Sequence, residues 1–260
     1  MGDEILLFWA VIAGLLAFDN LVLVPRGGDY LKIEGKARLV YQPSLRFKAR
    51  ARDLVLLNPL NPFDRLVTTQ QAVGPVTSDQ YAAARRTLRR SLPTVNALSA
   101  FGSAYLLVLL VLAALTFKVY FGVVLFTLAI AHIAFWTAGV TLMVMRQGLL
   151  SLTRGQLAGL AFEALLVPGY VVNLGKRVWL KRSLDLAAMT LGLRAVGRIA
   201  DESTRDLYVH QMSRRLDELS FELGVASDED TLARSGEADN TRNWFKKARR
   251  CLKASAQAAG

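Results

Sequence analysis

Two long apolar runs follow one another in the middle of the chain. They cover Leu98–Phe117 and Val119–Met145, and Lys118 is the only charged residue between them. A helix needs about 20 apolar residues to cross a bilayer core of roughly 30 Å. Because both runs reach this length, we expect a transmembrane helical hairpin over residues 98–145.

A third apolar run, Ile5–Val24, lies near the N-terminus and is interrupted only by Asp19 and Asn20. Secretory signal peptides begin with basic residues and end in a small-residue cleavage site. Here the preceding residues are acidic and the run ends in Leu-Val-Leu-Val. We therefore expect a retained transmembrane helix and three spans in total.

A fourth apolar stretch, Leu157–Gly175, contains Glu163, a Pro-Gly break at Pro168 and Asn173. A complete span here would place the cations that follow it on the side of the membrane away from the other large basic segments. We expect an interfacial or re-entrant element broken near Pro168. An amphipathic pattern over Arg177–Val196 follows it.

The segment between the first two spans, residues 25–97, is basic and shows period-two patterns. Tyr30–Tyr41 has the alternation of a hairpin, with Gly35 in the turn, and Leu45–Asp53 alternates like a strand. Its cations would then share one face, since alternate residues of a strand point the same way. These cations are Arg46, Lys48, Arg50 and Arg52.

A short helix is expected from Ser78 or Asp79 to Ser91, ended by Pro93. Four arginines recur at helical spacing along one side of it. They are Arg85, Arg86, Arg89 and Arg90. Cations near the cytoplasmic leaflet are attracted by anionic lipids, so this helix and the basic strand are candidates for contact with lipid headgroups. The alternative is that they only fix the topology of the chain.

The C-terminal part reads as helical. A helix capped by Ser203 or Thr204 is expected to run to about Leu223, and Ser227–Asn240 is an acidic linker. The terminal segment Arg242–Lys253 has aromatic residues on one face and cations around the rest, as in helices that lie at a membrane interface or dock onto a partner. The residues concerned are Trp244, Phe245, Lys246, Lys247, Arg249 and Arg250.

These patterns predict an all-α polytopic membrane protein with three transmembrane helices, a small basic, partly β cytoplasmic insertion and a helical cytoplasmic tail. Five segments result. They are the first helix (1–24), the basic insertion (25–97), the hairpin (98–145), interfacial or re-entrant and amphipathic helices (146–199) and the tail (200–260).

The charge distribution predicts the orientation. Thirty-one of the 32 Lys and Arg residues lie in residues 25–97 and 146–260, whereas the N-terminal tail is acidic and the hairpin tip carries only Lys118. Cytoplasmic segments of membrane proteins are enriched in Lys and Arg. The abundance of Ala and Leu and the excess of Arg over Lys are typical of bacterial inner-membrane proteins. We therefore expect a protein of the bacterial inner membrane, with the N-terminus outside and the C-terminus in the cytoplasm.

Ionisable residues at membrane depth are functional candidates, because burying a charge in lipid is unfavourable. Asp19, His132 and Glu163 meet this description. They could relay protons or hold an ion, or they could be structural, with His132 bonding across a helix interface. Small residues that would let helices approach closely are Ser99, Gly102, Ser103, Ala131 and Gly139.

No nucleotide, hydrolase or zinc motif is present in the sequence, and two histidines with one cysteine lack the spacing of a metal or haem site. No cofactor, metal or nucleic acid is expected. The leading hypothesis is a non-catalytic membrane subunit or scaffold that contacts anionic lipid and associates with another membrane protein or with itself. Transport through Asp19, His132 and Glu163 is the alternative, and a membrane-embedded lipid enzyme is a third.

Overall fold

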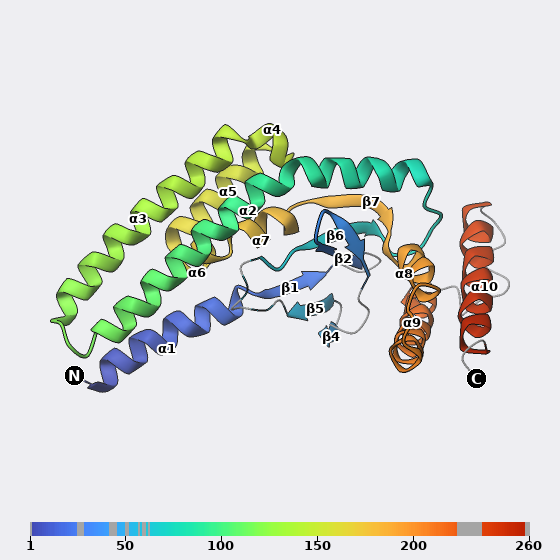
Figure 1. The fold of residues 1–260 in the computed structure, drawn as a ribbon, viewed down its shortest axis with the longest axis horizontal. Helices are drawn as coiled ribbons and strands as arrows, with labels where there is room; N and C mark the ends of the chain where they lie inside the picture. Colours follow the sequence, from blue (N-terminus) through green and yellow to red (C-terminus); the bar gives the residue numbers. More distant parts are fainter. Residues whose placement is uncertain are drawn as a thin grey trace. The chain divides into compact units, whose positions relative to one another are not determined.

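The computed structural model of the chain describes residues 2–24, 29–41, 46–49, 52–56, 58, 61, 63–222 and 236–257. The chain divides into two compact units. Unit 1 consists of Met1–Val22, Leu56–Leu66 and Thr87–Arg182, and unit 2 of Leu23–Val55, Val67–Arg86 and Ser183–Gly260. Most of the described residues are helical, and two of the helices are long and apolar (Figure 1).

Unit 1 is built from helices. Their bounds are α1 Gly2–Phe18, α2 Ser78–Leu115 (from Thr87 onward), α3 Phe121–Met145, α4 Gln147–Leu150, α5 Arg154–Leu166, α6 Pro168–Val172 and α7 Leu174–Leu180.

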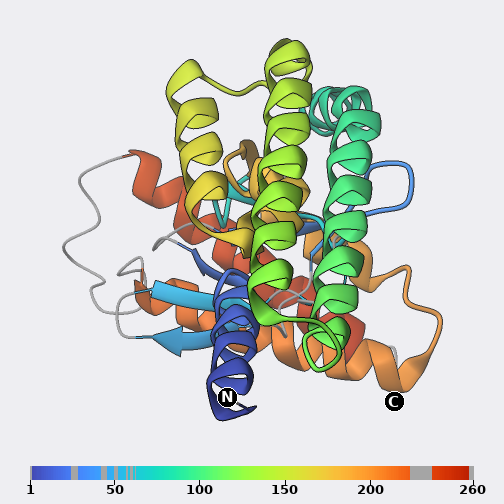
Figure 2. The ribbon, with the colours of Figure 1, turned by 90° about the vertical axis from the view of Figure 1, so that its left-hand side faces the viewer.

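Helices α2 and α3 form the hairpin that the apolar pattern predicts, and the turn between them contains Lys118 (Figures 1 and 2). Between Ser91 and Arg146 this lysine is the only Lys, Arg, Asp or Glu. By length and composition both helices could cross a membrane. The sequence therefore located this pair of helices correctly.

The first helix is shorter than predicted, because α1 ends at Phe18 and Leu21–Val24 form strand β1. Its 17 residues extend about 26 Å at 1.5 Å per residue, less than a bilayer core of roughly 30 Å. Polar side chains fix this end, since Asn20 Nδ2 donates to the carbonyl of Leu16 at 2.6 Å and Asp19 is buried. Among the described helices only α2 and α3 have the length and composition of a span, not three.

Helix α1 packs against the turn end of the hairpin and against α6. Trp9 Nε1 donates to Thr116 Oγ1 at 3.0 Å, and the Phe8 and Phe121 rings meet edge to face. Further along α1, the backbone of Leu16 lies so close to Gly169 that a Cβ there would be 3.4 Å from Leu16 Cα.

Helices α5, α6 and α7 follow α3 for part of its length and then return. Figure 2 shows α5 beside α3, where Trp136 Nε1 donates to the carbonyl of Ala161 at 2.8 Å. The chain breaks at Pro168, the first residue of α6, as the sequence predicts. Gln156 Nε2 donates to the carbonyl of Lys181 at 3.2 Å, so the end of α7 meets the start of α5. The segment from α5 to α7 thus begins and ends at the same end of unit 1.

Helix α2 continues through Pro93, where the sequence predicts an end. A proline inside a helix lacks the N–H that would bond the carbonyl four residues earlier, here that of Arg89. Ser91 and Val95, on either side of the proline, are fully buried, and Arg182 Nη1 donates to Ser91 Oγ at 2.6 Å. Packing on both sides of Pro93 therefore holds the helix together.

Unit 2 contains a small mixed sheet of four strands in the order β3-β2-β6-β7. Strands β2 (Asp29–Glu34) and β3 (Arg38–Val40) pair antiparallel. Gly35 and Ala37 in their turn have φ values of +49° and +66°, so the predicted hairpin is confirmed. Strands β6 (Leu66–Gln71) and β7 (Ser183–Ala187) pair parallel.

The predicted single strand over Leu45–Asp53 is wrong, because two strands form there. They are β4 (Arg46–Ala49) and β5 (Arg52–Leu56), which pair antiparallel with Lys48 opposite Asp53, within a sheet of order β1-β5-β4. Residues 50 and 51 lie outside the described residues. Alternating polarity is the same in one long strand and in two short ones, so the pattern could not locate the turn.

Three helices complete unit 2. They are α8 (Ala188–Val196), α9 (Glu202–Glu222) and α10 (Gly236–Gln257). The amphipathic pattern over Arg177–Val196 divides between the end of α7, strand β7 and helix α8, so it is not one helix.

Two further details differ from the sequence prediction. Asp201 caps α9 instead of Ser203 or Thr204, since its Oδ2 accepts from the Thr204 amide at 2.8 Å. The last five residues of the predicted linker, 236–240, belong to α10, and the rest of it lies outside the described residues.

The core of unit 2 holds a buried polar group. The Tyr41 hydroxyl donates to Asp29 Oδ2 at 2.9 Å, and Arg215 Nε lies 3.8 Å from the same oxygen. Tyr208 donates to the Tyr41 carbonyl at 3.0 Å, which connects α9 to β3. Burial raises the pKa of Tyr41 above its ordinary value, so this hydroxyl stays protonated and acts as a structural donor.

Candidate functional site

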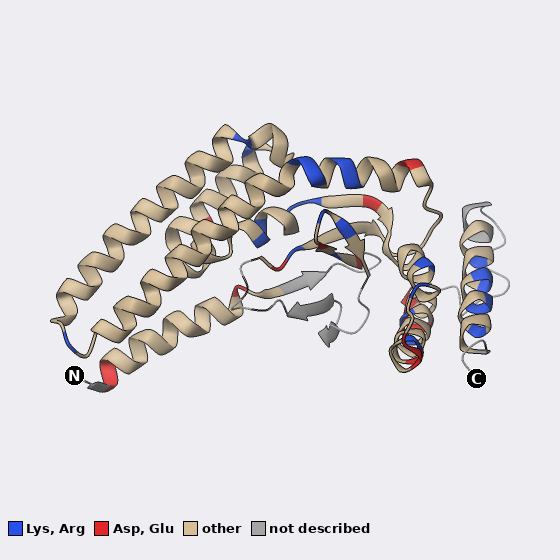
Figure 3. Cartoon of the chain, in the orientation of Figure 1, with Lys and Arg blue, Asp and Glu red and all other residues tan. Residues whose placement is uncertain are grey.

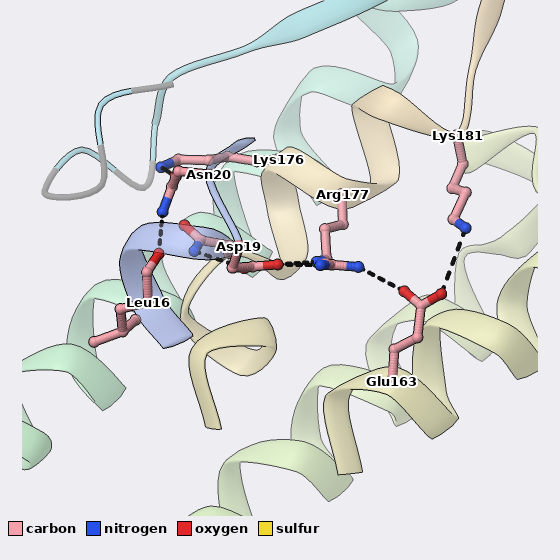
Figure 4. A network of polar contacts seen from close by, with 8 residues as sticks. Leu16, Asp19, Asn20, Glu163, Lys176, Arg177 and Lys181 are labelled. Carbon is pink, nitrogen blue, oxygen red and sulfur yellow. Dashed lines mark hydrogen bonds and ion pairs between the residues drawn. The ribbon is translucent and has the colours of Figure 1, made fainter. Parts of the chain in front are cut away.

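Two of the three predicted membrane-depth residues meet at one arginine of unit 1 (Figure 4). Arg177 Nε donates to Asp19 Oδ1 at 2.6 Å, and its Nη1 donates to Glu163 Oε2 at 2.6 Å. Arg177 Nη2 also pairs with Asp19 Oδ1. The guanidinium fork suits such contacts, because it presents several donors in one plane. One cation of α7 therefore joins the end of α1 to the middle of α5.

Neighbouring amides and lysines complete this group, which we call the Arg177 cluster. Asn173 Nδ2 donates to Asp19 Oδ2 at 2.7 Å. Lys176 Nζ donates to Asn20 Oδ1 and to the carbonyl of Asn58, both at 2.7 Å. Lys181 Nζ lies 3.7 Å from Glu163 Oε1. The cluster consists of Asp19, Asn20, Glu163, Asn173, Lys176, Arg177 and Lys181.

Burial controls the electrostatics of the cluster. The Lys176 side chain is 1% exposed, and burial lowers its pKa to about 8, against the opposing influence of Asp64 and Asp19. The aromatic ring of Tyr170 covers Arg177, with the guanidinium carbon 3.2 Å from the ring centroid. The charges are thus paired within the protein, an arrangement suited to locking α1, α5 and α7 together.

His132, the third candidate, has partners of its own. Its Nε2 lies 2.9 Å from the carbonyl of Leu165, and its Nδ1 lies 3.0 Å from the Tyr105 hydroxyl. A carbonyl can only accept, so Nε2 carries a hydrogen and donates it to Leu165, while Nδ1 and the Tyr105 hydroxyl form the second hydrogen bond of the ring.

The Leu165 carbonyl is one of those that α5 leaves without a helical partner when the chain breaks at Pro168. His132 therefore caps the broken end of α5. Within the described residues it shares no hydrogen bond with the Arg177 cluster.

The predicted packing residues face the returning segment of the same chain. A Cβ at Gly102 would collide with the carbonyl of Val172, and a Cβ at Gly139 would lie 2.8 Å from the Leu174 side chain. Ser99 is buried beside Gly175. Ser103 bonds within its own helix, to the Ser99 carbonyl, and Ala131 is half-buried.

The predicted lipid-facing cations fall into two groups. Arg85, Arg86, Arg89 and Arg90 are all exposed on α2. Arg46, Lys48 and Arg52 belong to β4 and β5, but the environment of their side chains, and Arg50 altogether, lie outside the described residues.

Helix α10 uses its apolar face inside unit 2. Phe245, Ala248 and Leu252 are buried, and Trp244 Nε1 donates to Thr190 Oγ1 of α8 at 3.2 Å. Lys246, Lys247, Arg249 and Arg250 are exposed, and Arg249 pairs with Asp217 of α9 at 3.0 Å. Cys251 is exposed.

Sequence reasoning missed the cations and amides of the cluster, including Asn173, Lys176 and Arg177. The available signal was Glu163 and Asp19 in apolar surroundings, since a buried carboxylate requires a paired cation. The sequence could not say which cation serves. In the described part of the chain no group of three or more His, Cys, Asp or Glu residues could hold a metal ion.

In comparisons with known proteins, no family model, curated protein or solved structure matches the chain.

Proposed function

We propose that the chain is an integral membrane protein in which α2 and α3 cross the bilayer, and that it serves as a non-catalytic subunit or scaffold of a bacterial inner-membrane assembly. The observation that carries the membrane proposal is the exposed apolar surface of these helices. In the most apolar 18-residue stretch of α3 only 17% is buried inside the protein, and in that of α2 only 33% is buried. Large exposed apolar side chains on the two helices include Leu107, Leu110, Phe126, Ile130, Ile133 and Val144.

Neighbouring helices extend this surface. Leu7 and Phe18 of α1 are each 66% exposed, and Phe162 and Leu166 of α5 are also exposed. A soluble protein rarely exposes so much contiguous apolar surface. In a bilayer the same side chains would face lipid, and α5–α7 would form a re-entrant element that penetrates part of the bilayer and turns back at Pro168.

The charges of unit 1 support the predicted orientation. Asp3, Glu4 and Lys118 lie at the end where α1 meets the hairpin turn. Arg146 follows the far end of α3, Arg154 begins α5, and Arg182 bonds Ser91 next to Arg90, so these four arginines lie at the other end of unit 1. The stretches of α2 and α3 between the two ends are free of charge, as the tan helices of Figure 3 show. An excess of Lys and Arg is typical of the cytoplasmic side. The N-terminus and the Lys118 turn would then be outside.

Between a scaffold and a transporter, the hydrogen bonds favour the scaffold. A transport pathway needs polar groups that can exchange an ion or a proton with a cavity. Asp19 and Glu163 are instead paired with Arg177, and His132 caps α5. The described residues contain no feature that favours a lipid enzyme.

Membrane insertion is tested by extracting the membrane fraction with alkaline carbonate and by mapping topology. Cys251 is the only cysteine of the chain, so single cysteines are introduced in a Cys251→Ser background. We expect the protein to resist extraction. We expect Lys118→Cys to react with a membrane-impermeant maleimide from outside, and Arg198→Cys only after the membrane is opened. Release by carbonate, or labelling of both sites from one side, contradicts the proposal.

The subunit role is tested by purification from a mild detergent with mass spectrometry of the co-eluting proteins. A stoichiometric partner is the expected result. A lone chain with bound lipid contradicts the subunit role. Transport then becomes the leading alternative, and ion flux into proteoliposomes, compared between the unmodified chain and Asp19→Asn or His132→Gln, decides it.

A further inference from the structure

Four arginines gather at one end of unit 1, although they come from three separate segments. Arg182 Nη1 donates to Ser91 Oγ at 2.6 Å, and its Nη2 lies 3.5 Å from Ser151 Oγ. The buried Arg182 side chain therefore holds α2 beside the connection between α4 and α5. Each of the four arginines lies within five residues of one of these serines. We call Arg89, Arg90, Arg146 and Arg154 the arginine cluster.

The four side chains differ from the other cations of this region in being exposed and without an ion-pair or hydrogen-bond partner among the described residues. Lys176 and Arg182 are buried and hydrogen-bonded, and Arg177 is paired with Asp19 and Glu163. All four arginines of the cluster are exposed. None of them forms an ion pair among the described residues. Their positive charge is thus available to an anion from outside the chain.

Exposed apolar side chains border the arginine cluster. Met145, next to Arg146, is 74% exposed, and Val144 and Leu149 are also exposed. On α5, Phe162 is exposed two turns beyond Arg154. The surface therefore changes from apolar to cationic over one or two helical turns. An apolar surface next to a cationic one matches a phospholipid, which carries apolar acyl chains attached to an anionic phosphate. A soluble polyanion has no apolar part that could contact these exposed apolar side chains.

We propose that the arginine cluster is a binding site for phospholipids of net negative charge, such as phosphatidylglycerol. The guanidinium groups bind the phosphate, and the apolar border receives the acyl chains. Arginine suits this role because its donors match a phosphate in two-point contacts. The proposal rests on the membrane insertion proposed above, and it adds a defined site that includes Arg146, directly after α3, and Arg154 of α5.

The test uses the full chain in a mild neutral detergent, titrated with phosphatidylglycerol or with phosphatidylcholine, and bound lipid is counted by native mass spectrometry. The unmodified protein should prefer phosphatidylglycerol. The Arg146→Gln/Arg154→Gln variant should bind it about thirtyfold more weakly, the factor expected for losing two cations near anionic lipid, with phosphatidylcholine binding unchanged. Lys246→Gln/Lys247→Gln removes the same charge from two exposed side chains of α10, so it is the matched control and should behave as the unmodified protein.

An unchanged preference in Arg146→Gln/Arg154→Gln, or an equal loss in the α10 control, overturns the site. Displacement of phosphatidylglycerol by inorganic phosphate at the same concentration also overturns it, because the acyl chains and the apolar border would then contribute nothing to binding. If Arg146→Gln/Arg154→Gln does not fold, Arg89→Gln/Arg90→Gln on α2 tests the same site. A chain that resists carbonate extraction but lacks the lipid preference overturns this site alone, whereas a chain released by carbonate overturns the proposed function.

Discussion

Arg177 donates from Nε to Asp19 at 2.6 Å across 158 residues of sequence. This contact joins the end of the first helix to the returning limb of the α5–α7 segment. The same guanidinium bonds Glu163 on the outgoing limb. A single side chain thus connects three helices that the apolar pattern alone would leave independent.

Replacing Arg177 by Met should destabilise unit 1 strongly. The Asp19 side chain is fully buried, and removing one partner of a buried pair costs about 3–5 kcal/mol because the other charge is left uncompensated. Thermal unfolding in detergent measures the loss. The Asp19→Asn/Arg177→Met double variant should lose less than the sum of the single changes, and Asp3→Asn, exposed on the same helix, should change little. Additive losses would show that the two side chains are not coupled.

Replacing His132 by Phe should lower the melting temperature, because it removes the hydrogen bond that His132 makes to the end of α5. The ring hydrogen at Nε2 satisfies the Leu165 carbonyl, and the loss of one such hydrogen bond costs about 0.5–1.5 kcal/mol. Tyr105→Phe should have a smaller effect. Thr127→Ala, which removes a hydroxyl bonded only to its own helix, serves as the control. A His132→Phe variant as stable as the control would refute the capping role.

Gly102→Ala should be poorly tolerated although it adds one methyl group. The added Cβ would meet the carbonyl of Val172 on α6, which is backbone and cannot swing aside. Overpacking of this kind costs about 1–3 kcal/mol or more. Gly159→Ala is the matched control, since nothing lies within 4 Å of its added Cβ. Size-exclusion profiles and melting temperatures compare the two variants, and equal behaviour would contradict the close approach of α2 and α6.

The stability of the protein should rise with pH through Lys176. Burial lowers the pKa of this lysine to about 8 in the folded state, from 10.5 for an unperturbed lysine. Between these values the unfolded chain binds more protons, so the free energy of unfolding increases with pH. The two pKa values differ by about 2.5, which corresponds to about 3.5 kcal/mol in total and to about 2.5 kcal/mol between pH 7 and pH 10, because one pKa unit is about 1.4 kcal/mol. Melting temperatures of the unmodified protein and of Lys176→Met are compared at pH 7 and pH 10. A difference that does not grow in favour of the unmodified protein would contradict the shift.

Phe245→Ala should release α10 from unit 2. Phe245 is 2% exposed and belongs to the face that packs on α8 and α9, and truncating a buried Phe costs about 3–5 kcal/mol. Limited trypsin digestion should then cut faster at the Lys and Arg residues of α10. Lys246→Ala, on the exposed side, should leave the other cleavage sites unaffected. Equal digestion of Phe245→Ala and the unmodified chain would show that this face does not hold the helix.

The sequence alone determined the features that depend on local pattern. Long apolar runs located α2 and α3 and the turn at Lys118, because each run is long enough to specify a helix without help from distant residues. Gly35 marked the β2–β3 turn, and Pro168 marked the break after α5. The composition of each segment also determined the separation of charge from apolar surface in unit 1.

Only the tertiary structure decided what depends on contacts between distant segments. Pro93 lies inside a helix because burial on both sides of it outweighs one missing hydrogen bond. The first helix ends at Phe18 because Asn20 caps it and Asp19 reaches Asn173 and Arg177. Gly102 and Gly139 allow Val172 and Leu174 of the same chain to pack closely against α2 and α3. A local pattern shows that a charge or a small residue needs a partner, but the partner is chosen by the fold, since it can come from more than 150 residues away.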